Sequence, residues 1–254
     1  TPIGKLAQTL SYGARVLQIR GTYDDCVRLV REMARKYGYF LCGDYAWRRE
    51  GQKSTSYEIV EQLGWRAPDI VICPVGFGSN FAALYKGFAE FKKLGLIERV
   101  PRLIAVQAAG CSPITDAWER RKSVCVPVLK PQTIAQAVAV GNPLDAPLVF
   151  TALKDTKGMA FKFSDEEILD AQAILGRRES VFLEPSSALP LAALIKICET
   201  KSLQEKLGLK VRGAGSGIVL IGTGNGLKDP RSVLKHVSTP PSADVDIGEV
   251  DRFL

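Results

Sequence analysis

The sequence predicts an α/β fold with a parallel sheet, because short apolar runs alternate along the chain with longer segments of helical periodicity. Three of these runs, residues 69–74, 103–107 and 217–221, carry almost no charge, which is typical of strands buried on both faces of a sheet. The chain has 254 residues, of which 46% are hydrophobic and 24% are charged. This composition is typical of a folded globular protein and excludes a disordered or low-complexity chain.

Two more strands are expected in the N-terminal part, at residues 14–20 and 39–42. Helices are expected where apolar residues recur at helical spacing. These segments are residues 23–37, 54–63, 81–94, 164–175, 185–199 and 229–237, and the first residues of the chain also lead into a helix. The fourth of these helices has the clearest start signal, a capping box in which Ser164 is the N-cap and Glu167 follows three residues later.

Charge and residue counts exclude several classes of site. The net charge of +7 is spread along the chain without a run of five like charges, so we expect solvated basic faces and no nucleic-acid groove. The single histidine, His236, lies in a polar stretch and is expected at the surface, which leaves no His-rich metal site. The six cysteines form no C-x-x-C pair, so we expect small buried thiols in a cytoplasmic protein. No apolar stretch approaches the ~18 residues of a membrane span.

A first glycine loop, Pro74-Val-Gly-Phe-Gly-Ser-Asn80, lies directly between a predicted buried strand and a predicted helix. Backbone N–H groups at such a helix N-terminus converge on an anion, and glycine lets the backbone approach it closely. The loop lacks the Gly-Lys-Ser/Thr ending of a Walker A loop, and Phe81 breaks the G-x-G-x-x-G pattern. The residues alone therefore leave two interpretations, a phosphate-binding loop or a tight turn that uses glycine for its dihedral angles.

A second glycine loop, Gly222-Thr-Gly-Asn-Gly-Leu-Lys-Asp229, follows the predicted strand at residues 217–221. Thr223 then stands at the carboxyl end of a parallel strand, where open α/β sheets bind their ligands. A ligand contact through the Thr223 hydroxyl and a plain glycine turn are both compatible with this pattern.

Taken together and in order, short motifs along the chain resemble the threonine synthase family. This family belongs to the tryptophan synthase β, or fold type II, superfamily of pyridoxal-phosphate enzymes. The motifs are Gly-Lys-Leu-Ala-Gln (4–8), Glu-Gly-Gln-Lys-Ser (50–54), Pro-Val-Gly-x-Gly-x-Asn (74–80), Val-Gln-Ala-Ala-Gly (106–110), Gly-Asn-Pro (141–143), Glu-Pro-Ser-Ser-Ala (184–188) and Thr-Gly-Asn-Gly-Leu-Lys-Asp-Pro (223–230). The likeness runs through nearly the whole chain, and the two glycine loops are its most specific parts.

The resemblance implies a pyridoxal 5′-phosphate site, an amino-acid substrate and the conversion of O-phospho-L-homoserine and water to L-threonine and phosphate. It implies that Thr223 binds the pyridine nitrogen, and that Arg48 and Lys53 bind the substrate phosphate. It also implies a cytoplasmic homodimer. The residues that it implies for the cofactor phosphate are Gly76, Phe77, Gly78, Ser79 and Asn80.

The resemblance also divides the chain. Residues 1–43 are expected to be the remainder of a smaller α/β domain, and residues 44–254 the large parallel-sheet domain that binds the cofactor. The lysine that forms the family's Schiff base lies in an upstream motif, and no lysine here has that context. We therefore expect this chain by itself to be inactive. Three alternatives stay open: a serine/threonine dehydratase, an enzyme like cysteate synthase, and a non-catalytic relative that has lost its lysine segment.

Overall fold

The computed structural model describes residues 3–43, 46–209, 217–234, 240–242 and 244. Its centre is a four-stranded sheet of order β3-β2-β1-β4, in which every neighbouring pair is parallel. In the register of this sheet, Ile70 lies opposite Arg102 on one side and Ile218 on the other. The strands are β1 (Ile70–Pro74), β2 (Arg102–Ala108), β3 (Met159–Phe163) and β4 (Ile218–Leu220). The predicted α/β class and parallel sheet are confirmed.

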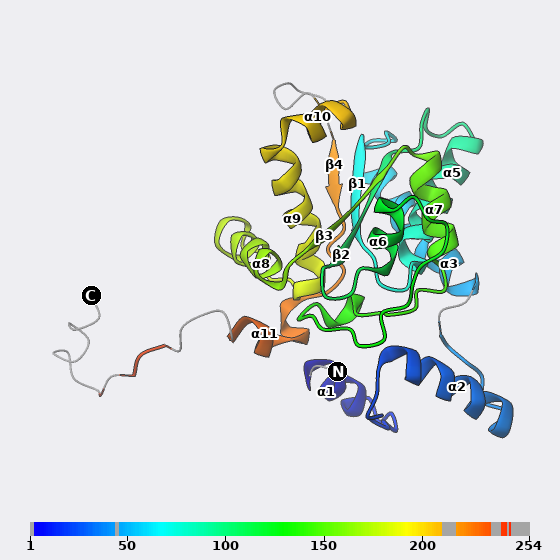
Figure 1. The fold of residues 1–254 in the computed structure, drawn as a ribbon, viewed down its shortest axis with the longest axis vertical. Helices are drawn as coiled ribbons and strands as arrows, with labels where there is room; N and C mark the ends of the chain where they lie inside the picture. The colour runs from blue at the N-terminus through cyan, green and yellow to red at the C-terminus, as the bar shows by residue number, and fades with distance from the viewer. Residues whose placement is uncertain (1–2, 44–45, 210–216, 235–239, 243, 245–254) are drawn as a thin grey trace.

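Helices cover both faces of the sheet, so the described body has three layers (Figure 1). One face carries α5, α6 and α7, with α3 and α4 packed outside α5, and the other face carries α8, α9 and α10. The helices are α1 (Ile3–Ser11), α2 (Tyr23–Tyr37), α3 (Ala46–Gln52), α4 (Ser54–Gln62), α5 (Ser79–Lys93), α6 (Pro113–Glu119), α7 (Ala146–Asp155), α8 (Asp165–Glu179), α9 (Pro185–Glu199), α10 (Lys201–Leu207) and α11 (Pro230–Leu234), with short 3-10 helices η1 (Gln136–Val138) and η2 (Gly226–Lys228).

Alternate residues of the central strands bury their side chains in two separate cores. Val71 and Cys73 of β1 face the core beneath α5 and α7, whereas Ile70 and Ile72 face the core beneath α8 and α9. This follows from the two-residue period of a strand, in which successive side chains point to opposite faces. All five residues of β1 are buried, which explains why its sequence reads as one continuous apolar run.

Several predicted helices are confirmed with small changes at their ends. The helices at 23–37 and 185–199 have the predicted bounds, and the helix predicted at 81–94 begins two residues earlier, at Ser79. The capping box before α8 is present: the N–H of Glu167 donates to Oγ of Ser164 at 3.2 Å, and the N–H of Ser164 donates to Oε2 of Glu167 at 2.7 Å. Part of the helix predicted at 229–237, and His236 with it, lies outside the described residues.

Two predicted strands, at residues 14–20 and 39–42, are wrong. Both segments are irregular, and their apolar side chains are exposed, with Leu17 74% and Phe40 84% accessible. A strand forms only where a neighbour accepts its backbone hydrogen bonds, and no strand of the described residues lies beside these segments. Conversely, β3 was not expected, because Lys162 interrupts its short apolar run at the edge of the sheet. Helices α6, α7 and α10 were not expected either.

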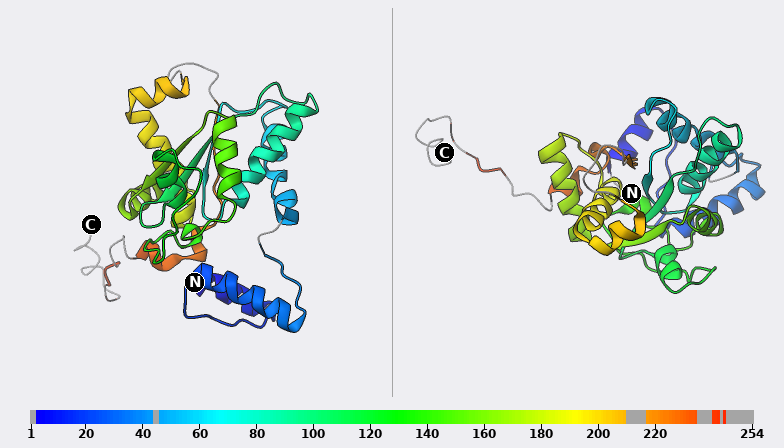
Figure 2. Two further views of the ribbon diagram at one scale, coloured as in Figure 1. Left: turned by 45° about the vertical axis from the view of Figure 1, so that its right-hand side comes forward. Right: turned by 90° about the horizontal axis from the view of Figure 1, so that it is seen from above.

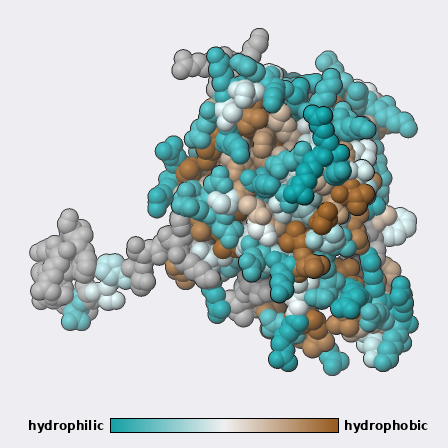
Figure 3. Space-filling view, in the orientation of Figure 1, coloured by the Kyte–Doolittle hydropathy of each residue, from teal (hydrophilic) through white to brown (hydrophobic). Residues whose placement is uncertain are grey.

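The N-terminal helices lie apart from the sheet layers. Figures 1 and 2 show α1 and α2 below the carboxyl ends of the strands. Helix α2 has no buried residue, and Tyr12, Tyr37 and Tyr39 are exposed near it. Figure 3 shows apolar residues at this lower end of the molecule. This part of the chain therefore leaves a large apolar area in contact with water.

Among the described residues, no helix is both long and apolar enough to cross a membrane. The cysteines are free thiols, and the expectation that they are buried holds for Cys73 and Cys111 but is wrong for Cys42 and Cys198, which are exposed.

Candidate active site

The two glycine loops lie side by side, because they follow neighbouring parallel strands. The first loop follows β1 and the second follows β4, and these strands pair directly. From β1 the chain continues to β2 and β3 on one side, whereas β4 is added on the other side. The point between β1 and β4 is thus the place where the strand order reverses, and open α/β sheets bind ligands at the carboxyl ends of the strands at this point.

The first loop presents a set of unused backbone donors. Within the described part of the chain, the N–H groups of residues 76–81 donate no hydrogen bond. Gly78 is the N-cap of α5 and has no side chain, so no side chain caps the N-terminus of this 15-residue helix. The uncapped N–H groups and the positive end of the helix dipole together favour an anion such as a phosphate group.

Two glycines of this loop are required by its geometry. Gly78 has φ of +107°, and a Cβ added there would lie 3.0 Å from Cγ2 of Val149. A Cβ added at Gly76 would lie 3.1 Å from Cα of Val138, in η1. Neither side of the loop therefore has room for a side chain. The structure therefore contains the tight glycine turn that the sequence left as one of two interpretations, and its open N–H groups are compatible with the other.

The polar side chains of the first loop point to protein partners. Oγ of Ser79 donates to Oδ2 of Asp145 at 2.9 Å, and Nδ2 of Asn80 donates to Sγ of Cys73 at 3.6 Å. Burial raises the pKa of the Cys73 thiol to about 12, so it remains a neutral thiol. The Phe77 ring makes an edge-on contact with Tyr23 of α2, at 6.4 Å between ring centres. The loop thus offers an anion its backbone more than its side chains.

The second loop presents one hydroxyl group to solvent. Thr223 is exposed at the end of β4, and its Oγ1 lies 2.7 Å from Oγ of Ser187 in the first turn of α9. Oγ of Ser187 also accepts a hydrogen bond from the N–H of Gly224 at 2.7 Å. Ser187, which belongs to the Glu-Pro-Ser-Ser-Ala motif, thus fixes the second loop.

An ion pair from α1 supports the second loop from behind. The Glu184 side chain is 7% exposed, and its Oε2 lies 2.7 Å from Nζ of Lys5. The backbone N–H of Glu184 donates to the carbonyl oxygen of Gly224 at 2.9 Å. Gly224 has no room for a Cβ, because the Glu184 carboxylate fills that space. The loop therefore depends on residues about 40 and about 220 positions away in the sequence.

Arg48, predicted for the substrate phosphate, is exposed on α3. Burial raises the pKa of the Tyr23 phenol, and the positive charge of Arg48 acts in the opposite direction. Tyr23 in turn contacts Phe77 of the first loop, so Tyr23 links Arg48 indirectly to this loop.

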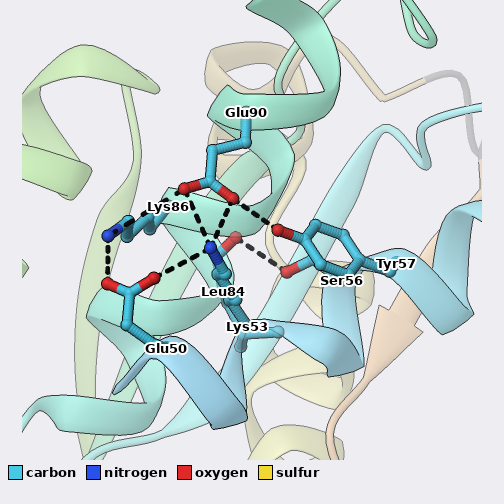
Figure 4. A network of polar contacts seen from close by, with 7 residues as sticks. All are labelled: Glu50, Lys53, Ser56, Tyr57, Leu84, Lys86 and Glu90. Carbon is cyan, nitrogen blue, oxygen red and sulfur yellow. Dashed lines mark hydrogen bonds and ion pairs between the residues drawn. The ribbon is translucent and has the colours of Figure 1, made fainter. Parts of the chain in front are cut away.

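Lys53 lies elsewhere. Its Nζ is 2.8 Å from Oε2 of Glu50 and 2.8 Å from Oε2 of Glu90, and Tyr57 and Lys86 complete this network (Figure 4). Glu90 follows Ser79 by eleven residues in α5, which corresponds to ~16 Å along the helix axis. The structure therefore does not bring Lys53 to the first loop, and its network holds α3 and α4 against α5.

Two residues of the site were not predicted. Arg49 donates through Nη1 to both carboxylate oxygens of Asp145, at 3.0 and 2.9 Å, and Asp145 in turn holds Ser79. Arg49 and Asp145 are 96 positions apart, and neither belongs to a motif with a spacing that indicates contact. The nearest signal was Gly-Asn-Pro (141–143), which ends two residues before Asp145.

An open helix N-terminus, beside a hydroxyl at the end of the adjacent strand, is an arrangement suited to a phosphorylated ligand with a second polar group. The residues present fit pyridoxal 5′-phosphate, since its phosphate matches the cradle and its ring nitrogen matches a hydroxyl donor. Residues 1–224 match the family described as "Pyridoxal-phosphate dependent enzyme", and the chain belongs to this family.

Two threonine synthases are among its relatives. The enzyme of Methanocaldococcus jannaschii is 39% identical over 99% of this chain and 60% of its own length. The enzyme of Mycobacterium tuberculosis is 39% identical over 96% of this chain and 63% of its own length. The chain thus spans about 60% of the length of these relatives.

Solved structures share its fold at lower identity. Maize serine racemase has a TM-score of 0.70 at 19% identity, over 92% of this chain and 67% of that one. Diaminopropionate ammonia lyase from Escherichia coli has a TM-score of 0.72 at 20% identity, over 92% of this chain and 62% of that one. These likenesses confirm the predicted fold type II architecture.

Proposed function

We propose that the protein containing this chain is a threonine synthase, which converts O-phospho-L-homoserine and water to L-threonine and phosphate. Relatives with this name are 35–39% identical to the chain, whereas structures named for deaminase, racemase or ammonia-lyase activity are 19–23% identical. The sequence likeness therefore favours the synthase, and the likeness to the other enzymes concerns the fold alone.

The meeting of the two glycine loops at the reversal of strand order carries this proposal. The open N–H groups of residues 76–81 bind the cofactor phosphate. Gly76 and Gly78 let the loop pack against η1 and α7 in the conformation that leaves these groups open. The bound cofactor supplies an electron sink for the carbon atoms of the substrate. The chain's own residues fix the position and the electrostatic surroundings of that group.

Thr223 is assigned to the ring nitrogen. Ser187 accepts the N–H of Gly224 and is free to donate its own hydroxyl hydrogen to Oγ1 of Thr223. The Thr223 hydroxyl hydrogen would then be available to donate to the ring nitrogen of the bound cofactor. A neutral donor leaves this nitrogen less protonated than a carboxylate would, so the residues around the substrate have more control over the reaction.

Arg48 is assigned to the phosphate group of the substrate, because an exposed guanidinium that Tyr23 links to the first loop suits bidentate binding of a phosphate. Lys53, the second residue implied by the resemblance, is assigned an indirect role. Through Glu50 and Glu90 it holds α3, and with it Arg48, against α5.

We also propose that residues 1–43 belong to a smaller domain, which α1 and α2 represent here. The exposed apolar side chains of this part are consistent with further chain packing against it. The upstream Schiff-base lysine, the homodimer and the cytoplasmic location remain predictions from the resemblance.

The activity is tested on the complete protein, loaded with pyridoxal 5′-phosphate. Release of inorganic phosphate from O-phospho-L-homoserine, with L-threonine formed in equal amount, is the expected result. Arg48→Met is expected to raise KM for this substrate by about tenfold or more, because a charged partner of the phosphate is lost. Formation of ammonia and a 2-oxo acid from serine or threonine, without phosphate release, would instead establish the dehydratase alternative.

A further inference from the structure

A mostly buried carboxylate lies directly behind the first loop. The Asp145 side chain is 13% exposed, and its Oδ2 accepts the hydrogen bond from Oγ of Ser79 at 2.9 Å. The N–H of Asp145 also donates to the carbonyl oxygen of Phe77 at 3.3 Å, so its backbone is fixed to the loop as well. A negative charge in this place opposes the binding of any anion, because like charges repel strongly where water is largely excluded.

The charge of Asp145 is cancelled by a residue from another layer of the fold. Nη1 of Arg49 lies 2.9 and 3.0 Å from the two carboxylate oxygens, and the arginine side chain is 25% exposed. Arg49 belongs to α3, which packs against α5 and is held there by the Lys53 network (Figure 4). The neutralising charge thus reaches the loop only when α3 is docked.

We propose that Arg49 and Asp145 form a charge-compensated positioning pair for the phosphate loop. Asp145 keeps the Ser79 hydroxyl turned toward itself, so that the loop presents backbone N–H groups to the anion. Arg49 removes the electrostatic cost of having that carboxylate so near. Neither side chain touches the ligand, so both are positioning residues. This inference rests on the proposed binding of pyridoxal 5′-phosphate at the loop.

The pair also connects the two phosphate sites of the proposed enzyme. Arg48, assigned to the substrate phosphate, is the residue next to Arg49 in α3. Fixing Arg49 to Asp145 therefore sets the position of α3, and with it the substrate cation, relative to the cofactor loop.

The test compares the affinity of the complete, cofactor-free protein for pyridoxal 5′-phosphate and for pyridoxal, which lacks the phosphate. Both are titrated by absorbance against the wild type, Arg49→Met, Asp145→Asn, the double variant Arg49→Met/Asp145→Asn and Arg49→Lys. Arg99→Met is the matched control, because Arg99 pairs with Asp69 at the amino end of β1, the opposite end of the sheet. Thermal melting shows that each variant is folded.

Charge compensation predicts a specific pattern. Arg49→Met weakens binding of pyridoxal 5′-phosphate by about tenfold or more and leaves pyridoxal nearly unchanged, because only the phosphate meets the bare carboxylate. Adding Asp145→Asn restores the affinity to within about threefold of the wild type, a non-additive result that reports the coupling of the two charges. Arg49→Lys keeps most of the affinity, and Arg99→Met changes nothing. If Arg49→Met does not fold, Arg49→Lys and the comparison of the double variant with Asp145→Asn take its place.

The proposal is overturned if Arg49→Met weakens both ligands equally, if the double variant is no better than Arg49→Met, or if Arg99→Met has the same effect. In each of these cases the wild type still binds pyridoxal 5′-phosphate, so the proposed function stands and only the positioning pair falls. A wild type that binds neither ligand removes the proposed function, and this inference with it.

Discussion

The two glycine loops occupy neighbouring strand ends but are held in place by different means. The first joins β1, which is buried along its whole length, to a 15-residue helix, and its anion donors lie in the loop and in the first turn of that helix. The second follows β4, a three-residue edge strand without a fully buried residue. It is fixed by Ser187 and Glu184 of a distant segment and, through Glu184, by Lys5. The anion donors therefore follow from the local order of strand, loop and helix, with Asp145 and Arg49 as tertiary support, whereas the Thr223 hydroxyl is positioned by tertiary contacts.

Gly78→Ala is expected to have the largest effect, and it acts on the first glycine loop. The change forces an alanine into φ of +107° and places its Cβ 3.0 Å from Val149, so we expect a loss of about 3 kcal/mol in the free energy of unfolding. Anion binding at the loop is expected to be lost with it. Urea unfolding and titration with pyridoxal 5′-phosphate measure the two effects.

Gly95→Ala is the matched control for this change. Gly95 has φ of +74°, but nothing lies within 4 Å of an added Cβ, so only backbone strain of about 1 kcal/mol is expected. Equal losses in the two variants would show that the first loop is not tightly packed.

Ser187→Ala tests the second glycine loop and is expected to destabilise the protein less than Gly78→Ala. The buried N–H of Gly224 loses its acceptor, so we expect a loss of about 1–2 kcal/mol in the free energy of unfolding and weaker cofactor binding. Thr223→Val removes an exposed hydroxyl and is expected to change stability by less than about 0.5 kcal/mol while it weakens cofactor binding to a similar degree. If Thr223→Val left the affinity and the absorbance spectrum of the bound cofactor unchanged, the assignment to the ring nitrogen would be wrong.

The ion-pair network of Lys53, Glu50, Glu90 and Lys86 gives the smallest expected effect. Hydrogen bonds from Lys53 and Lys86 lower the pKa of Glu50 to about 2. The network therefore stabilises the folded protein at pH above the unfolded value of 4.5, and this contribution is lost as the pH falls from there toward 2.

Glu50→Gln is expected to remove this part of the acid dependence of stability. Urea midpoints of the variant and the wild type at about pH 6 and about pH 3 measure the difference. The same slope with pH in both proteins would show that the network adds no stability, as is common for exposed ion pairs.

Local sequence signals predicted those elements whose structure depends on residues close together in the chain. Examples are the capping box of α8, the apolar run of β1 and the glycine loop that leads into α5. In each of them the residues that give the signal lie within a few positions of the structure that they form. The same holds for the first half of the candidate site. The resemblance to threonine synthase joined the two loops into one site, which no local pattern required.

The sequence by itself determined the α/β class, the buried strand β1 and a glycine loop at the start of α5, because periodicity and glycine positions act over short distances. Only the tertiary structure decided that residues 14–20 and 39–42 are not strands, since a strand needs a partner. It also separated Lys53 from the loop and brought Arg49, Asp145 and Ser187 to it. Ion pairs and hydrogen bonds depend on distance in space and not on separation in the sequence. The pairs Lys53–Glu90, Ser187–Gly224 and Arg49–Asp145 lie 37, 37 and 96 residues apart in the chain.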